Sequence, residues 1–81
     1  MHGISRLSEL PVGEKGEVVS LSSSGNERRR MLDLGLIQGT TVEAISKSPS
    51  GNPIAYFIRG AVIALRDIDA DRILIRRHFA S

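Results

Sequence analysis

The 81-residue chain contains no cysteine and no tryptophan, and its aromatic residues are one tyrosine and two phenylalanines. The absence of cysteine excludes disulfide bonds, thiolate metal sites and cysteine nucleophiles, and it suits a reducing compartment. Three aromatic side chains are a poor basis for the stacking platform with which small barrels bind single-stranded nucleic acid. They are equally poor for an aromatic groove that binds Pro-rich peptides.

Long apolar segments and a strong net charge are also lacking. The longest uninterrupted apolar run, Ala61–Leu65, is far shorter than the ~20 residues that cross a bilayer, and no apolar signal segment follows the first residues. The net charge is +2, from 11 basic and 9 acidic residues, which does not by itself indicate nucleic acid as a partner. We therefore expect a cytoplasmic protein.

Motifs for catalysis are missing. The sequence has no Gly-x-Ser-x-Gly and no Gly-x-x-x-x-Gly-Lys-Ser/Thr phosphate loop. Its two histidines, His2 and His78, stand near opposite ends of the chain, without the spacing of a metal site. We predict that the chain is not an enzyme and that it has no cofactor.

The alternating acids at 67, 69 and 71 resemble the opening of a calcium-binding loop. The comparison fails further on, because Arg72 stands where that loop requires glycine and His78 where it requires the bidentate glutamate. We therefore expect a polar turn over residues 67–71 and no metal site.

The composition that remains is that of one ordinary globular domain spanning residues 1–81. The chain is 41% apolar and 25% charged, and no repeat or linker divides it. Strands are predicted at residues 14–21, 41–47, 54–59, 61–65 and 72–76, with a Pro- and Gly-rich loop at residues 49–53. About five short strands and one inserted helix predict a mainly β fold, an SH3-like barrel first and an OB-fold second. Closure of the barrel would hide the edges of the sheet.

The inserted helix is expected to follow the first strand and to span two to three turns. Ser24 and Glu27 have the spacing of a capping box. Gly35 stands where a left-handed C-terminal cap is expected, so we predict a positive φ there. The apolar residues at the end of the helix should close one end of the core: Met31, Leu34 and Leu36.

Motifs spread over nearly the whole chain, from residue 7 to residue 75, belong to one pattern. They are Leu7-x-x-Leu10-x-x-Gly13, Gly16-x-Val18, Arg29-Arg30-Met31-Leu32-Asp33-Leu34-Gly35-Leu36-x-x-Gly39-Thr40, Pro49-Ser50-Gly51-Asn52-Pro53, Gly60-x-x-Ile63-Ala64-Leu65-Arg66 and Asp69-Ala70-x-x-Ile73. Together they resemble the FeoA family, the small cytosolic component of bacterial ferrous-iron uptake. In that family the loop usually ends Gly-Asp-Pro, whereas Asn52 replaces the aspartate here. Asparagine can make the same turn, but it carries no negative charge.

The resemblance implies an SH3-like barrel without enzymatic activity of its own. It also implies a partner, the cytosolic portion of the FeoB-type, GTP-dependent membrane transporter, so that contact with the membrane would be indirect. The chain would then regulate or assemble that transporter. Two alternatives stay open at this point: a nucleic-acid-binding small barrel, and a detached SH3-like domain related to iron-dependent repressors. For the second, no DNA-binding helix pair is visible in the sequence.

A docking surface is predicted on the inserted helix and the loop after the second strand. The three arginines at 28–30 are either a solvated helix face or a patch that binds an acidic partner. Because the core needs the apolar residues of this helix, recognition must use the residues that remain outside. The predicted partner-binding residues are Arg29, Arg30, Asp33, Ser50, Gly51 and Asn52.

Overall fold

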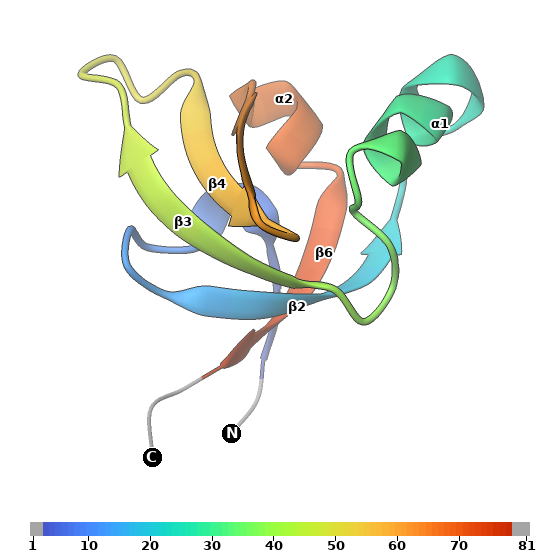
Figure 1. Cartoon of the computed structure of the whole chain (residues 1–81), viewed down its shortest axis with the longest axis horizontal. Helices are drawn as coiled ribbons and strands as arrows, with labels where there is room; N and C mark the ends of the chain where they lie inside the picture. Colours follow the sequence, from blue (N-terminus) through green and yellow to red (C-terminus); the bar gives the residue numbers. More distant parts are fainter. Residues whose placement is uncertain (1–2, 79–81) are drawn as a thin grey trace.

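One antiparallel sheet forms the frame of the molecule in the computed structural model, which describes residues 3–78. Six strands lie in the order β1-β6-β2-β3-β4-β5. Along the chain the elements are β1 (Ile4–Arg6), the 3-10 helix η1 (Leu7–Glu9), β2 (Lys15–Leu21), α1 (Gly25–Asp33), β3 (Thr41–Lys47), β4 (Ile54–Ile58), β5 (Ala61–Leu65), α2 (Asp67–Ala70) and β6 (Ile73–His78). Both helices stand at the same end of the sheet (Figure 1). The mainly β class predicted from the sequence is confirmed.

The sheet encloses a single apolar core because its strands alternate between buried and exposed side chains. β4 shows the pattern clearly, with Ile54, Tyr56 and Ile58 buried and Phe57 exposed between them. The best-buried side chains come from the strands, from η1 and from the end of α1: Leu7, Leu10, Val18, Met31, Leu36, Val42, Tyr56, Ile58, Ile73 and Ile75.

The first strand and η1 are absent from the sequence-based prediction, which expected a turn-like entry and about five strands. β1 has only three residues, and it exists because Ile4 and Arg6 pair with Arg76 and Leu74 of β6. Leu7, which begins η1, is completely buried. Its carbonyl oxygen accepts a hydrogen bond from the Tyr56 hydroxyl at 3.2 Å. A segment this short carries too little pattern to reveal a pairing made with a strand at the far end of the sequence.

The start of α1 differs from the predicted capping box, whereas its end agrees with the prediction. The Ser24 side chain makes no capping hydrogen bond, and Glu27 instead binds Arg72 at 2.6 Å. Gly35 has φ +100°, as predicted. The N–H of Leu36 donates to the carbonyl oxygen of Met31 at 3.1 Å, which is the bond of a Schellman cap. Of the three residues expected to close the core, Met31 and Leu36 are buried and Leu34 is partly buried.

Asp67–Ala70 form the short helix α2 where the sequence predicted a turn over residues 67–71. The N–H of Ala70 donates to the carbonyl oxygen of Arg66 at 3.0 Å, and that of Asp71 to Asp67 at 2.8 Å. Ala70 is completely buried, so packing of this one apolar side chain selects a helical turn over an open one. Local propensity alone would not show this.

The predicted barrel would close the sheet and hide its edges. In the described part of the chain, however, the strands at both ends of the sheet have an unpaired edge. Within residues 3–78, β1 pairs only with β6 and β5 pairs only with β4. The outer edges of β1 and β5 therefore have no strand partner there, although the N–H of Arg6 in β1 donates to the Glu9 carboxylate at 2.9 Å. The edge of β5 borders the site described next.

Candidate docking site

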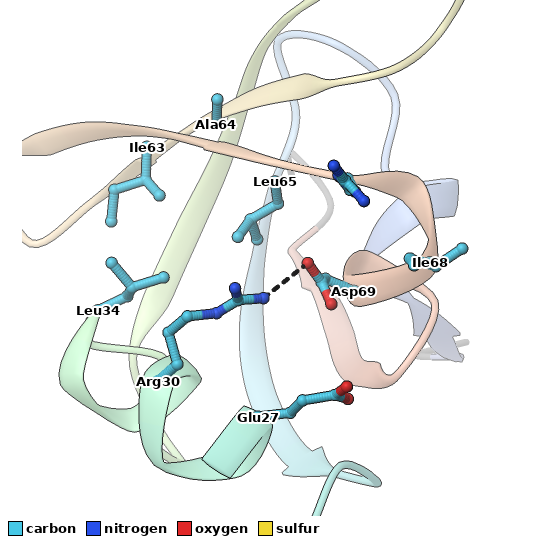
Figure 2. A pocket seen from close by; sticks show the side chains of 9 residues that line it. Glu27, Arg30, Leu34, Ile63, Ala64, Leu65, Ile68 and Asp69 are labelled. Atoms are coloured by element: carbon cyan, nitrogen blue, oxygen red, sulfur yellow. Dashed lines mark hydrogen bonds and ion pairs between the residues drawn. The ribbon is translucent and has the colours of Figure 1, made fainter.

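An open groove of about 560 Å³ lies between α1 and β5 and ends at α2 (Figure 2). It joins parts of the chain that are far apart in sequence, because α1 follows the second strand whereas β5 is the fifth strand. Its lining combines apolar and charged side chains: Glu27, Arg30, Leu34, Ile63, Ala64, Leu65, Arg66, Ile68 and Asp69.

An ion pair crosses the groove from α1 to α2. The Arg30 guanidinium lies 3.1 Å from the Asp69 carboxylate, and the Arg30 side chain is 60% exposed while that of Asp69 is 15% exposed (Figure 2). An exposed pair of this kind adds only about 0–1 kcal/mol of stability. Its more important effect is geometric, since it holds the Arg30 head group at the mouth of the groove.

Within residues 3–78, both acids that line the groove are paired, whereas one of its two arginines is not. Glu27 is neutralised by Arg72 at 2.6 Å, and Asp69 is neutralised by Arg30. Arg66, by contrast, has no ion-pair partner within the described part of the chain. Both acids of the lining are thus compensated while one arginine is not, which favours an acidic ligand.

Apolar side chains make the floor of the groove. Figure 2 shows Ile63 and Leu65 directed from β5 toward α1, where Leu34 faces them. Ile63 and Leu34 are partly buried against the core, whereas Leu65 is buried. At the α2 end, Ile68 is 56% exposed. An apolar floor with charged rims is the usual composition of a protein–protein contact surface.

Of the predicted docking residues on α1, only Arg30 enters the groove. Arg29 and Asp33 are exposed on α1 but do not line it. The helical period of 3.6 residues explains the separation, because neighbouring residues on a helix point in different directions.

The predicted loop residues Ser50, Gly51 and Asn52 lie on the other side of α2. The Asn52 side-chain oxygen accepts the backbone N–H of Asp67 at 3.2 Å, and the Ser50 hydroxyl donates to the Asn52 carbonyl oxygen at 3.0 Å. The neutral asparagine therefore holds the loop against the first residue of α2. Arg30 and Asn52 contact the same short helix from two directions, but they do not form one surface.

The sequence-based prediction missed most of the groove: Ile63, Leu65, Arg66, Ile68 and Asp69. Two clues to it were present. Ile68 is an apolar residue within a run of acids, and Arg66 ends one of the recognised motifs. Neither could be connected to α1 without knowing that β5 turns back beside that helix.

The three acids at 67, 69 and 71 do not converge. Asp67 accepts the N–H of Ile68 at 2.8 Å, Asp69 binds Arg30, and Asp71 accepts a hydrogen bond from the Ser8 hydroxyl. Within residues 3–78, no three His, Asp or Glu side chains are grouped to hold a metal ion. His2 lies outside the described residues, as does the side chain of His78.

The described part of the chain also contains no helix with the length and apolar character needed to span a membrane.

The fold and the groove together define a small, mainly β domain of the SH3-like class. The FeoA domain matches residues 5–77, and the chain belongs to this family, which functions in ferrous iron transport.

A curated relative supports the assignment. The chain is 34% identical over 68 residues to a fusion of Fe(2+) transport protein A with the Fe(2+) transporter FeoB from Porphyromonas gingivalis. The match covers 84% of this chain but only 8% of the fusion protein, so the chain corresponds to a small part of that relative.

Solved structures of similar proteins have the same fold. A FeoA-like protein from Clostridium acetobutylicum is 30% identical, with a TM-score of 0.89 and coverage of 100% of this chain and 94% of that one. FeoA from Stenotrophomonas maltophilia, solved in complex with zinc and described as a prokaryotic SH3 domain protein, is 29% identical, with a TM-score of 0.76 and coverage of 93% and 88%. The predicted SH3-like fold is thereby confirmed.

Proposed function

We propose that this chain is a non-catalytic docking module that binds the cytosolic portion of a FeoB-type ferrous-iron transporter. The fusion of Fe(2+) transport protein A with FeoB in one polypeptide carries the proposal. A covalent link keeps two domains at a high effective concentration. A separate chain of the same family reaches the same arrangement by binding, and it acts in the cytoplasm, meeting the membrane only through the transporter.

The chemistry of the groove suits recognition. Its acids are held in ion pairs with Arg30 and Arg72, so their charges are compensated within the chain. The exposed apolar side chain of Ile68 and the free charge of Arg66 supply the two components of a contact surface, apolar area and electrostatic complementarity.

The direct test is binding of the full chain to the cytosolic portion of the FeoB-type transporter from the same genome, measured by calorimetry at two salt concentrations. Saturable binding with a defined stoichiometry supports the proposal. Absence of binding, together with steeply salt-dependent binding to an oligonucleotide, would support the nucleic-acid alternative instead.

Charge-reversal variants can show which of the docking residues predicted on α1 contributes to transporter binding. Arg29→Glu and Arg30→Glu together should weaken transporter binding at least ~10-fold, about 1.4 kcal/mol, while exposed substitutions of this kind change stability by only about 0.5 kcal/mol. The single variants then show which arginine is responsible. We expect Arg30→Glu to have the larger effect, because Arg30 lines the groove and Arg29 does not. Circular dichroism confirms that each variant is folded.

A further inference from the structure

We propose that the free edge of β5 receives an extended acidic segment of the partner protein, which adds to the sheet as a further strand and lies in the groove beside α1. This inference rests on the proposed docking function and specifies its surface. The argument has three parts: the main-chain groups that β5 leaves unpaired, the shape and apolar floor of the groove, and the charges at both ends of the strand.

The turn before β5 determines which main-chain groups point outward. Arg59 (φ 50°) and Gly60 (φ 86°) form a two-residue turn of the type that closes β-hairpins. The pair beside such a turn, Ile58 with Ala61, is hydrogen-bonded. Hydrogen-bonded and non-bonded pairs then alternate. The N–H and C=O groups of Val62 and Ala64 therefore point away from β4, toward the open edge.

This edge lacks the features that usually protect an exposed strand. Natural edges are blocked by charged side chains, proline or a bulge, but the five residues of β5, Ala-Val-Ile-Ala-Leu, include no charge and no proline. The β4–β5 register is continuous from end to end, so no bulge twists the edge away. Val62 is 65% exposed. An edge of this kind is suited to accept another strand.

The groove fits an added strand beside β5. Side chains of an extended segment alternate between two faces, so every second residue would point into the groove. There it would meet Leu34 and Ile63, and Ile68 near α2 (Figure 2). The other residues would point out toward solvent. Main-chain hydrogen bonds to Val62 and Ala64 would provide affinity, and the apolar floor would select the inward-facing side chains.

Charges at the two ends of β5 favour an acidic segment. Arg59 precedes the strand and Arg66 follows it, and neither has an ion-pair partner within residues 3–78. The acids that line the groove, Glu27 and Asp69, are already paired. An extended segment with acidic side chains would meet an uncompensated arginine at each end.

A second copy of this chain would bring charges of both signs to the ends of β5. Antiparallel pairing of two β5 strands about Ile63 would place Arg66 of one copy opposite Gly60 of the other, and Asp67 opposite Arg59. Each end would then receive a further arginine as well as an acid, whereas an acidic segment brings acids alone. The opposite edge offers no acidic strand either, since β1 is Ile-Ser-Arg.

The first test uses the full chain and a short synthetic peptide of alternating glutamate and valine. Amide NMR should show shifted resonances and slower hydrogen exchange at Val62 and Ala64 on titration. The same peptide N-methylated at alternate amides, and a peptide of alternating lysine and valine, should each bind at least ~10-fold more weakly, about 1.4 kcal/mol. Equal binding of all three peptides, or shifts that avoid β5, would overturn the inference.

The second test uses protein variants and the cytosolic portion of the transporter. Ala64→Pro removes an outward N–H, a position where an edge strand tolerates proline, and Arg66→Glu reverses a free charge. Each should weaken binding at least ~10-fold. Lys47→Glu makes the same charge change at an exposed residue outside the groove and should leave binding within about twofold, a fraction of the tenfold step. If Ala64→Pro does not fold, the test rests on the difference in transporter binding between Arg66→Glu and Lys47→Glu.

The outcomes separate this inference from the proposed function. Transporter binding that is unchanged in folded Arg66→Glu and Ala64→Pro would leave the docking function in place and overturn the β5 surface. A peptide-bound β5 edge without transporter binding would support the surface and overturn the partner. Self-association of the wild-type chain in sedimentation, abolished by Ala64→Pro, would identify a second copy as the occupant and overturn the acidic segment.

Discussion

The two edges of the sheet are built differently. β1 has three residues and leads directly into η1, where Leu7 is completely buried and its carbonyl oxygen accepts the Tyr56 hydroxyl. β5 has five residues, and beyond its outer edge lies an open groove. The first edge is therefore attached to the core by buried contacts, while the second is left accessible beside α1.

This difference shows how a small domain can use one edge of its sheet for stability and the other for recognition. Below 100 residues a domain buries only roughly 60% of its unfolded surface, so few side chains can be spared from the core. On the β1 side Leu7 of η1 is completely buried, although Ile4 of β1 is half exposed. On the β5 side, Val62 and Ile68 stay more than half exposed, and substitutions there should affect binding far more than folding.

The largest expected effect is on the β1 side. Leu7→Ala removes a completely buried side chain and should lower the free energy of unfolding by about 2–5 kcal/mol. Ile68→Ala, at a position that is 56% exposed, should change it by only about 0.5 kcal/mol. Urea denaturation followed by circular dichroism measures both. Similar losses in the two variants would contradict the division between the edges.

A smaller effect is expected at the C-terminus of α1. Gly35→Val places a β-branched side chain at φ +100° with its Cβ 2.9 Å from Arg59 Cδ. The strain should cost roughly 1–3 kcal/mol and displace α1 from β5. Gly3→Val is the matched control, because a Cβ at Gly3 meets no atom of the described chain within 4 Å. A melting temperature unchanged in Gly35→Val would disprove the role of this cap.

Tyr56→Phe tests the hydrogen bond that links β4 to η1. We expect a loss of about 0.5–1.5 kcal/mol, toward the lower end because Leu7 O also accepts the N–H of Leu10 at 3.0 Å. Thermal unfolding at neutral pH measures it. A variant as stable as the wild type would show that the bond contributes nothing.

Burial of Tyr56 also predicts that the protein loses stability at alkaline pH. Burial, with a smaller contribution from the charge of Asp71, raises the pKa of Tyr56 well above its usual value. Below pH ~10 both folded and unfolded chains keep the phenolic proton, so the contribution is fully present. Above that pH the unfolded chain loses the proton first, and stability falls as pH rises toward the folded-state pKa. Tyr56→Phe should lack this part of the fall; parallel pH curves for the two proteins would refute the burial effect.

The smallest effect on stability is expected at the open edge itself. Val62→Lys changes a side chain that is 65% exposed and should alter stability by no more than about 0.5 kcal/mol. It adds the kind of charge that protects natural edge strands, so transporter binding should weaken. Ile4→Lys, at a half-exposed position of the other edge, should leave binding unchanged. Equal effects of the two variants on binding would remove the distinction between the edges.

Local chemistry made much of the fold predictable. The strands at 41–47 and 61–65 have the predicted bounds, because β-branched runs between turn residues carry a clear pattern. Gly35 was predictable for a similar reason, since a glycine after a helical stretch is the common left-handed cap. Glu27 was misassigned to a cap because its spacing from Ser24 is correct, yet Arg72, distant in sequence, lies close enough to bind it instead.

The sequence by itself determined the mainly β class, the place of the helix and the family pattern from residue 7 to residue 75. All of these depend on residue type and short-range spacing. Only the tertiary structure decided that Ile4–Arg6 is a strand, that Asp67–Ala70 is a helix, and that Arg30 of α1 reaches Asp69 across the groove. Those features depend on contacts between segments tens of residues apart, and no local pattern encodes which distant segment will lie alongside.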